Sequence, residues 1–194
     1  GKKKNGKQVS AKGLKKGASY VVASKGKKKK KKKILRVENP VIFLNKFAKL
    51  KRENCKAKIL AITGSAGKTS LKNILNLLLQ KYGYTYASPK SFNNHYGVPV
   101  SLSNLNLNHQ FGVFEVGMSR SGEIDQLSKM IKPDLALITN IAEAHIENFS
   151  NIKGIAKAKS EIIRNIKNNG TLILNRDDKF FNYLNNIAKL KNIK

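Results

Sequence analysis

The sequence predicts an α/β fold in which helices cover a parallel sheet. From Ala57 onward, short apolar runs of strand length alternate with stretches whose apolar residues recur at a helical spacing. The first run leads into a glycine-rich loop, and polar residues follow each of the later runs. Strands that alternate with helices are typical of parallel sheets, because a crossover helix returns the chain to the edge where the next strand begins.

A basic segment precedes this pattern. Residues 1–38 are low in complexity and contain one apolar stretch, at 18–23, that is expected to form a short strand. Asn39-Pro40 is a turn signal and marks the predicted boundary between a first segment, 1–38, and a main domain, 39–194. Within the main domain, residues 41–50 have apolar side chains at a helical spacing.

The elements of the main domain are read from its apolar pattern. Strands are predicted at the apolar runs 59–63, 111–116, 135–139 and 171–174. Helices are predicted at 69–80, at 124–131 before Pro133, at 152–166 before Gly170, and at 180–190. No strand follows the last helix, so we expect a sheet that lacks its final strands.

Size and charge exclude several classes of protein. The chain of 194 residues has a hydrophobic fraction of 40%, which is enough for a packed core, and a formal net charge of +28. Much of the excess lies in the lysine blocks at residues 2–4 and 27–33, where no aromatic residue is interleaved, which is typical of a solvated stretch. No apolar run has membrane-spanning length, and Cys55 has no partner for an internal disulfide. We therefore expect a cytoplasmic monomer with no membrane span and no specific nucleic-acid partner.

The strongest functional signal is Thr63-Gly64-Ser65-Ala66-Gly67-Lys68-Thr69-Ser70. Its glycines let backbone N–H groups approach phosphate oxygens, and the following helix directs its positive end at the same anion. Lys68 can reach the β- and γ-phosphates of ATP, and the Thr69 hydroxyl can bind Mg²⁺. The standard motif has a glycine where Ile62 stands, and the alternative is a glycine turn before an ordinary helix. The strand–loop–helix context favours Mg·ATP binding.

Ligand-capable side chains also follow the other predicted strands. Glu115 ends the second strand, where a buried carboxylate must be paired or metal-bound. Beside a phosphate loop, a second Mg²⁺ ligand is favoured over a structural salt bridge. His145 follows the third strand, and considered alone it would be a structural histidine, as Lys159 would be an exposed helix lysine. Because ligands bind beyond the carboxyl ends of parallel strands, we expect one site at that edge.

The same residues resemble a known family. Residues 63–70 resemble the shortened phosphate loop of the Mur ligases, in which the leading glycine is missing. The blocks at 91–99, 114–118 and 139–147 resemble one type within that family, which adds D-alanyl-D-alanine to UDP-N-acetylmuramoyl-tripeptide in peptidoglycan synthesis. The resemblance runs in consistent order from about residue 57 to residue 178.

The resemblance implies a domain organisation and a reaction. Residues 1–38 would be the remnant of a small N-terminal α/β domain for the UDP end, and residues 39–194 a central ATP-binding domain truncated at its end. A C-terminal domain would be absent, which would leave the chain inactive by itself. The γ-phosphoryl group of ATP would pass to the tripeptide carboxylate, and the amine of D-alanyl-D-alanine would attack the resulting acyl phosphate.

The resemblance also implies residue roles. Residues 63–70 would hold ATP, and Asn175 and Asp177 would lie toward its adenosine. Thr69 and Glu115 would bind one Mg²⁺, while Glu115 and His145 would serve a second. Lys159 matches a lysine that is carbamylated in related ligases and would then be a further metal ligand. Asn93 and Asn94 would face the muramoyl peptide.

Two alternatives stay open. The chain could belong to a sibling Mur ligase that adds a different amino acid, which a panel of substrates would distinguish. It could instead be a basic module whose lysine tracts bind RNA or an acidic surface, with a vestigial loop. A salt titration of polyanion binding, compared with a nucleotide-binding assay, would separate this class from an enzyme.

Overall fold

The computed structural model describes residues 6–25, 33–143 and 146–194. The chain forms two compact units, Gly1–Lys46 and Phe47–Lys194. The division between them falls inside helix α2 (Pro40–Asn54), later in the chain than the boundary predicted after residue 38. The assignment of residues 1–38 to a substrate-recognition domain stays a prediction.

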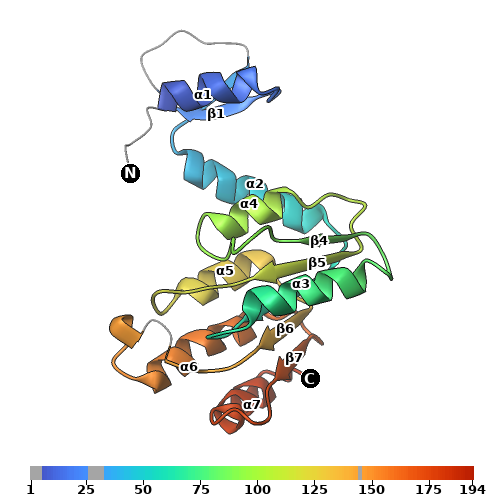
Figure 1. Ribbon diagram of the computed structural model, residues 1–194, viewed down its shortest axis with the longest axis vertical. Helices are drawn as coiled ribbons and strands as arrows, with labels where there is room; N and C mark the ends of the chain where they lie inside the picture. Colours follow the sequence, from blue (N-terminus) through green and yellow to red (C-terminus); the bar gives the residue numbers. More distant parts are fainter. Residues whose placement is uncertain (1–5, 26–32, 144–145) are drawn as a thin grey trace. The chain divides into compact units, whose positions relative to one another are not determined.

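The first unit is a small α/β element. It contains α1 (Gly6–Lys15) and two parallel strands, β1 (Val21–Ser24) and β2 (Ile34–Val37), followed by the start of α2 (Figure 1). β1 overlaps the strand predicted at 18–23. The sequence did not predict α1 or β2, because α1 has few apolar residues and β2 is a short strand that directly follows the lysine run. Most of that run, at 27–32, lies outside the described residues.

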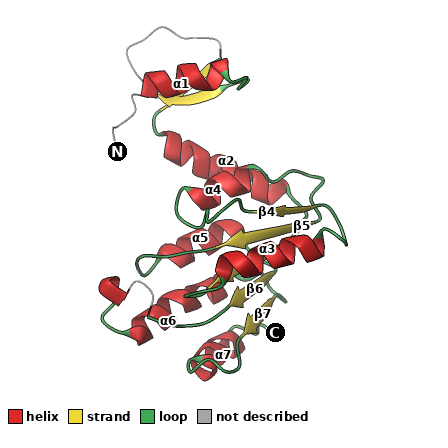
Figure 2. Cartoon of the chain, in the orientation of Figure 1, coloured by secondary structure: helices red, strands yellow, loops and turns green. Residues whose placement is uncertain are grey.

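The second unit is built on a parallel sheet of five strands in the order β4-β5-β3-β6-β7 (Figure 2). The strands are β3 (Lys58–Thr63), β4 (Thr85–Ala87), β5 (Phe111–Glu115), β6 (Leu135–Ile138) and β7 (Thr171–Leu174). The parallel sheet and the four predicted strands are thus confirmed. The edge strand β4 was not predicted, since three residues are too few to show an apolar pattern.

Helices connect these strands and cover the sheet. They are α3 (Lys68–Leu79), α4 (Gly97–Ser103), α5 (Glu123–Ile131), α6 (Ile152–Ser160) and α7 (Phe181–Leu190), with the 3₁₀ turns η1 (Ile146–Asn148) and η2 (Glu161–Asn165). With this strand order, right-handed crossovers place α3 on one face and α4, α5 and α6 on the other. The predicted helix at 152–166 is divided into α6 and η2.

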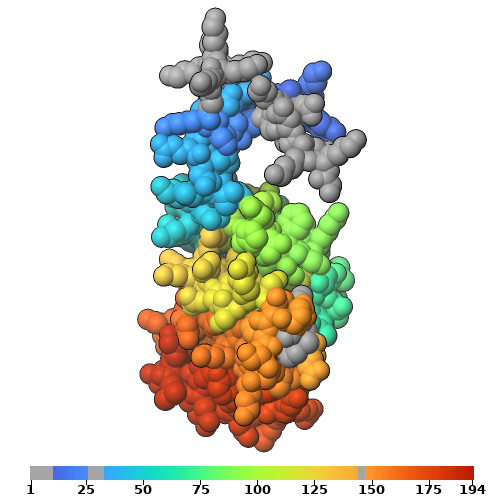
Figure 3. Space-filling model, turned by 90° about the vertical axis from the view of Figure 1, so that its left-hand side faces the viewer, coloured from blue at the N-terminus to red at the C-terminus, as the bar shows by residue number. Residues whose placement is uncertain are grey.

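The strands end on one side of the second unit, and helices α5, α6 and α7 lie along that side. The arrow of β5 in Figure 1 points to the left, and Figure 3 views the molecule from that side. There the surfaces of α5 (yellow), α6 (orange) and α7 (red) follow one another, in agreement with the α5–α6 and α6–α7 contacts. None of the helices in the described ranges is long and apolar enough to cross a membrane.

The core lies between the central strands and their helices. Ile59 and Ile62 of β3 and Phe114 of β5 are fully buried. Helix α3 departs from its apolar pattern, because Ile74 and Leu78 are 53% and 49% exposed while Lys72 is only 1% exposed. The apolar spacing therefore located this helix correctly but did not identify its buried face.

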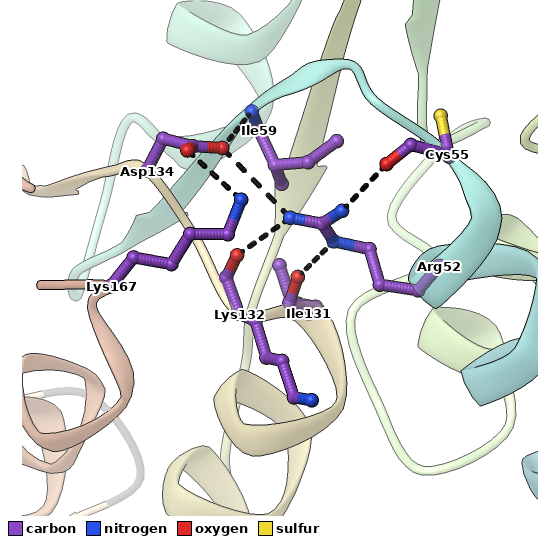
Figure 4. A network of polar contacts seen from close by, with 7 residues as sticks. All are labelled: Arg52, Cys55, Ile59, Ile131, Lys132, Asp134 and Lys167. Carbon is purple, nitrogen blue, oxygen red and sulfur yellow. Dashed lines mark hydrogen bonds and ion pairs between the residues drawn. The ribbon is translucent and has the colours of Figure 1, made fainter.

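A buried arginine joins the helices at the amino end of the sheet (Figure 4). Arg52, at 4% exposure, donates from Nε to the carbonyl of Ile131 at 2.6 Å and from Nη2 to that of Lys132 at 2.8 Å. Its Nη1 donates to the carbonyl of Cys55 at 3.1 Å. One planar guanidinium thus donates hydrogen bonds to backbone carbonyls at both the C-terminal end of α5 and the turn after α2.

Asp134 completes this network just before β6. Its Oδ2 accepts a hydrogen bond from the backbone N–H of Ile59 at 2.8 Å and lies 3.8 Å from Nη2 of Arg52. Its Oδ1 accepts from Lys167 Nζ at 3.0 Å. The charges of Arg52, Asp134 and Lys167 therefore each face an opposite charge or a hydrogen-bond partner (Figure 4).

Candidate nucleotide-binding site

The glycine loop joins the carboxyl end of β3 to the first turn of α3. At Gly64, φ is 145° and an added Cβ would lie 1.8 Å from Oγ1 of Thr139, so only glycine fits. At Gly67, which caps α3, φ is 77° and an added Cβ would have no atom within 4 Å. The loop is therefore packed tightly against β6 on one side and open over the start of α3. The N–H groups of that first turn lack partners within the helix and are available to an anion bound in this space.

Thr139 and Asn140, which directly follow β6, hold the glycine loop in shape. Asn140 Oδ1 accepts hydrogen bonds from the backbone N–H groups of Ser65 at 3.1 Å and Ala66 at 2.9 Å. Thr139 Oγ1 donates to the carbonyl of Ala66 at 2.6 Å. Asn140 was not among the predicted site residues, although its place at the end of a predicted strand was a usable signal.

Lys68 lies over the loop. Its Nζ donates to the carbonyl of Gly64 at 2.7 Å. Burial lowers the pKa of Lys68 from its usual range, and the nearby Glu115 carboxylate opposes this shift. Neutral carbonyl oxygens hold the ammonium in this structure, so a phosphate oxygen over the loop would offer it a stronger, charge-assisted acceptor.

Glu115 is a buried carboxylate at the end of β5. The register pairs it with Ile62, which brings it to the level where β3 enters the loop, and it is only 1% exposed. Its Oε2 accepts a hydrogen bond from Thr69 Oγ1 at 2.8 Å, and its Oε1 accepts from Asn93 Nδ2 at 2.7 Å. Lys72 Nζ forms an ion pair with Oε2 at 3.8 Å. These contacts satisfy the requirement that a buried charge be paired and hydrogen-bonded.

The donor atoms around Glu115 fit a magnesium ion that is bound together with a nucleotide. The Thr69 hydroxyl and the Glu115 carboxylate oxygen lie 2.8 Å apart, so both can contribute to one ion. In the described part of the chain, no group of three or more His, Cys, Asp and Glu side chains could hold a metal by itself. Mg²⁺ commonly takes one or two protein oxygens and completes its shell with phosphates and water.

Lys159, on α6, is buried and close to Lys68. It is 3% exposed, which corrects the interpretation from composition alone that it is an exposed helix lysine. Burial, and then repulsion by Lys68, lowers the pKa of Lys159 to about 7. An amine with this pKa is about half neutral at pH 7, when it can act as a nucleophile.

Glu161 fixes α6 against the start of α5. Its Oε1 accepts hydrogen bonds from the N–H of Gly122 at 2.7 Å and from Ser121 Oγ at 3.0 Å. Its Oε2 accepts from the N–H of Asp125 at 3.1 Å. A carboxylate at the N-terminus of a helix is stabilised by the helix dipole. No pattern in the sequence predicts this role, because the three donors lie in a distant segment.

The predicted substrate residues Asn93 and Asn94 differ in their contacts. Asn93 reaches Glu115, as described above, whereas Asn94 is exposed. Asn94 Oδ1 accepts from the N–H groups of Tyr96 at 3.1 Å and Gly97 at 2.9 Å, which begins α4. The structure therefore gives Asn94 a role in shaping the loop.

The remaining predicted residues make none of the contacts described above or lie outside the described residues. Asn175 and Asp177 are exposed on the turn after β7, where Asn175 Oδ1 accepts from the N–H of Asp177 at 3.1 Å. The neighbouring Asp178 instead contacts the segment that follows β6, since its Oδ2 accepts a hydrogen bond from the N–H of Ile141 at 2.6 Å. Thr63 is fully buried, and Ser70 is exposed. His145 lies outside the described residues, so its metal role stays a prediction.

A strand–glycine loop–helix unit with a Thr–Glu pair beside it defines a P-loop domain of the α/β class. Residues 62–194 match the family described as Mur ligase middle domain. The chain belongs to the Mur ligase family, as the loop and the later blocks predicted.

Named relatives indicate which type of Mur ligase the chain resembles. The chain is 42% identical over 175 residues to the UDP-N-acetylmuramoyl-tripeptide–D-alanyl-D-alanine ligase of Rickettsia prowazekii, covering 90% of this chain and 39% of that protein. It is 44% identical over 157 residues to the ligase of the same name from Buchnera aphidicola, covering 81% of this chain and 34% of that protein. The chain thus spans well under half the length of these relatives.

Solved structures give the same comparison. A crystal structure of MurF from Acinetobacter baumannii superimposes with a TM-score of 0.85 at 32% identity, covering 98% of this chain and 42% of that one. MurF ligase from Thermotoga maritima, in complex with ADP, superimposes with a TM-score of 0.81 at 32% identity, covering 98% and 44%. At this level of identity the likeness extends beyond the fold class.

Proposed function

We propose that the protein acts as an ATP-dependent amide ligase that joins D-alanyl-D-alanine to UDP-N-acetylmuramoyl-tripeptide. The observation that carries the proposal is the Thr69–Glu115 pair, with its 2.8 Å hydrogen bond, beside the Lys68 loop. The names of the relatives support this substrate pair over that of a sibling ligase. The ADP bound to the Thermotoga maritima relative supports nucleotide use.

The loop and its neighbours would hold the nucleotide. Lys68 and the N–H groups at the start of α3 would bind the β- and γ-phosphates, and Thr69 and Glu115 would hold Mg²⁺. When bound, the ion would neutralise charge on the phosphates. In the proposed reaction the γ-phosphoryl group passes to the tripeptide carboxylate, releasing ADP. The amine of D-alanyl-D-alanine then attacks the acyl carbon, and phosphate leaves.

The loop that carries Asn93 would face the muramoyl peptide. Its support is the contact of Asn93 Nδ2 with Glu115 Oε1 at 2.7 Å, which joins this loop directly to the proposed magnesium ligand. A peptide carboxylate on this loop would then lie close to the γ-phosphate. His145 is proposed as an additional metal ligand on the family resemblance alone, and Asn175 and Asp177 as residues near the adenosine.

Lys159 would work as a carbamate. The ammonium first loses a proton; the neutral amine then attacks CO₂, forms an N–C bond and releases a second proton, so a group of charge +1 becomes one of charge −1. Its pKa of about 7 makes the neutral amine available, and the negative product removes the repulsion by Lys68. A carbamate is a carboxylate-like ligand, of the kind that Mg²⁺ prefers.

Chemical rescue tests the carbamate. In the full-length enzyme, Lys159→Ala should abolish turnover while ATP affinity is largely kept. Short-chain carboxylic acids should restore part of the activity, and amines should not. Rescue by amines alone would show that the ammonium is the working species.

A substrate panel tests the proposed reaction. The full-length protein that carries this chain is incubated with Mg·ATP, the tripeptide precursor and D-alanyl-D-alanine, and the pentapeptide product is measured by mass spectrometry. Lys68→Ala is the control, in which product should fall sharply. Product formed only with a sibling's amino acid would contradict the assignment. Salt-sensitive polyanion binding without nucleotide binding would favour the basic module instead.

A further inference from the structure

Lys72 is a buried lysine that the proposed chemistry does not use. It lies one turn beyond Lys68 on α3 and is 1% exposed. Its Nζ forms an ion pair with Glu115 Oε2 at 3.8 Å and donates a hydrogen bond to the backbone carbonyl of Lys90. Burying an ammonium is costly, so its two partners indicate what the charge is for.

The second partner lies in the loop between β4 and α4. Lys90 has φ of 48°, a left-handed conformation that residues other than glycine rarely adopt, and Lys72 binds the carbonyl of this residue. The hydrogen bond from Lys72 therefore helps to hold an unfavourable backbone conformation. The loop of residues 88–96, which carries Asn93 and Asn94, is fixed at this point from α3.

The same loop contacts Glu115 and its neighbour at other points. Ser88 Oγ accepts from the N–H of Glu115 at 3.3 Å, and the carbonyl of Asn93 accepts from the N–H of Gly117 at 2.8 Å. Together with Asn93 Nδ2 on Oε1, these bonds attach Ser88, at the start of the loop, and Asn93, near its middle, to the end of β5. Lys72 provides a further link, between Lys90 and Oε2.

We propose that Lys72 is a positioning residue that couples the 88–96 loop to the nucleotide site. Its ammonium joins the Lys90 carbonyl to the carboxylate oxygen that also accepts from Thr69. A divalent cation at Oε2 would share this oxygen with the ammonium, which leaves the Lys90 carbonyl as the stronger partner of Lys72. Mg·nucleotide binding and the conformation of the loop would then depend on each other, and such coupling is reciprocal. The identity of the ligand rests on the proposed function.

Hydrogen exchange of the loop amides measures this coupling. Exchange of residues 88–98 is followed by mass spectrometry with and without Mg·ADP in the wild type, in Lys72→Met and in Lys129→Met, which removes an exposed lysine of α5. In the wild type and in Lys129→Met, Mg·ADP should slow loop exchange by about tenfold. In Lys72→Met the loop should exchange about tenfold faster without ligand, and Mg·ADP should change it little.

A second pair of variants covers the case in which Lys72→Met does not fold. Glu115→Gln keeps the link between Lys72 and Lys90, whereas the double variant Lys72→Met/Glu115→Gln removes both charges of the ion pair together. Without ligand, the loop should exchange faster in the double variant than in Glu115→Gln. Equal exchange in these two variants would overturn the positioning role.

The outcomes separate this proposal from the proposed function. If the folded wild type does not bind Mg·ADP by calorimetry, the nucleotide function and the coupling both fail, while the ligand-free comparison still decides whether Lys72 holds the loop. If Mg·ADP binds and slows the loop equally in the wild type and in Lys72→Met, the coupling is wrong and the nucleotide function stands.

Discussion

The buried charges at the two ends of the parallel sheet differ in how well they are matched by opposite charges and hydrogen-bond partners. At the amino end, the guanidinium of Arg52 donates to three carbonyls and faces Asp134, which also accepts from Ile59 and Lys167 (Figure 4). At the carboxyl end, Lys68 and Lys72 lie near the buried carboxylate of Glu115, and the buried Lys159 lies close enough to Lys68 to be repelled by it.

This difference separates structural support from binding. A balanced network stabilises the fold and has no remaining capacity for a ligand. The surplus of positive charge at the carboxyl end is unfavourable in the free protein and becomes favourable when phosphates or a carbamate supply the missing negative charge. Substitutions at the first end should therefore change stability, and substitutions at the second should change binding.

The largest effect is expected at Arg52. Arg52→Met would leave three carbonyls and Asp134 without their buried partner, so the free energy of unfolding should fall by about 3–5 kcal/mol. Urea denaturation measures the loss, with Arg120→Met, which changes an exposed arginine, as the control. The fraction that stays folded should bind Mg·ADP like the wild type. A loss below about 1 kcal/mol would contradict the structural role.

Lys159→Met should raise the free energy of unfolding, whereas Arg52→Met lowers it. Below pH 7, Lys159 is protonated in both the folded and the unfolded chain, so the full cost of burying its charge is present. Between pH 7 and about 10.5, the folded lysine is neutral while the unfolded one is still charged. The variant should therefore be more stable than the wild type by roughly 2–4 kcal/mol at pH 6.

The gain from Lys159→Met should shrink as the pH rises from 7 toward 10.5. Denaturation at several pH values in CO₂-free buffer measures this dependence, because carbamylation would mask it. Lys157→Met, on the exposed side of the same helix, is the matched control. A gain that is independent of pH would show that folding does not lower the pKa of Lys159, because the folded and unfolded chains would then bind its proton equally.

A smaller effect is expected at Thr69. Thr69→Val keeps the shape of the side chain and removes the hydroxyl next to Glu115, so ADP affinity should fall about fivefold, near 1 kcal/mol, when Mg²⁺ is present. Without Mg²⁺ the affinities of the wild type and the variant should agree. Calorimetry under both conditions measures the difference. An equal loss with and without the ion would assign Thr69 to the phosphates alone.

The sequence identified the parts of this site that depend on local patterns. The apolar runs located β3, β5, β6 and β7, and the glycine spacing identified the loop with Lys68 and Thr69. Glu115 was predicted because a carboxylate at the end of an apolar strand is unusual in itself. The edge strand β4 and the short helix α4 were missed, since neither is long enough to show a period.

The rest of the site depends on contacts between distant segments. Lys72 was one polar residue within an amphipathic helix, and only the fold brings it to Glu115 and to the 88–96 loop. Glu161 and Asn140 bind backbone groups from other crossovers, which no local pattern records. The burial of Lys159 has the same origin, because it depends on how α6 packs and not on the neighbouring alanines and lysines.

The central claim is that the carboxyl end of the sheet binds Mg·ATP through the Lys68 loop. Calorimetric titration of the folded wild type and of Lys68→Ala with Mg·ATP tests it most directly, with circular dichroism to establish that both are folded. Loss of the ammonium should weaken binding at least tenfold, which corresponds to about 1.4 kcal/mol or more. Equal affinity in the two proteins, or no binding by the folded wild type, would contradict the assignment of this loop.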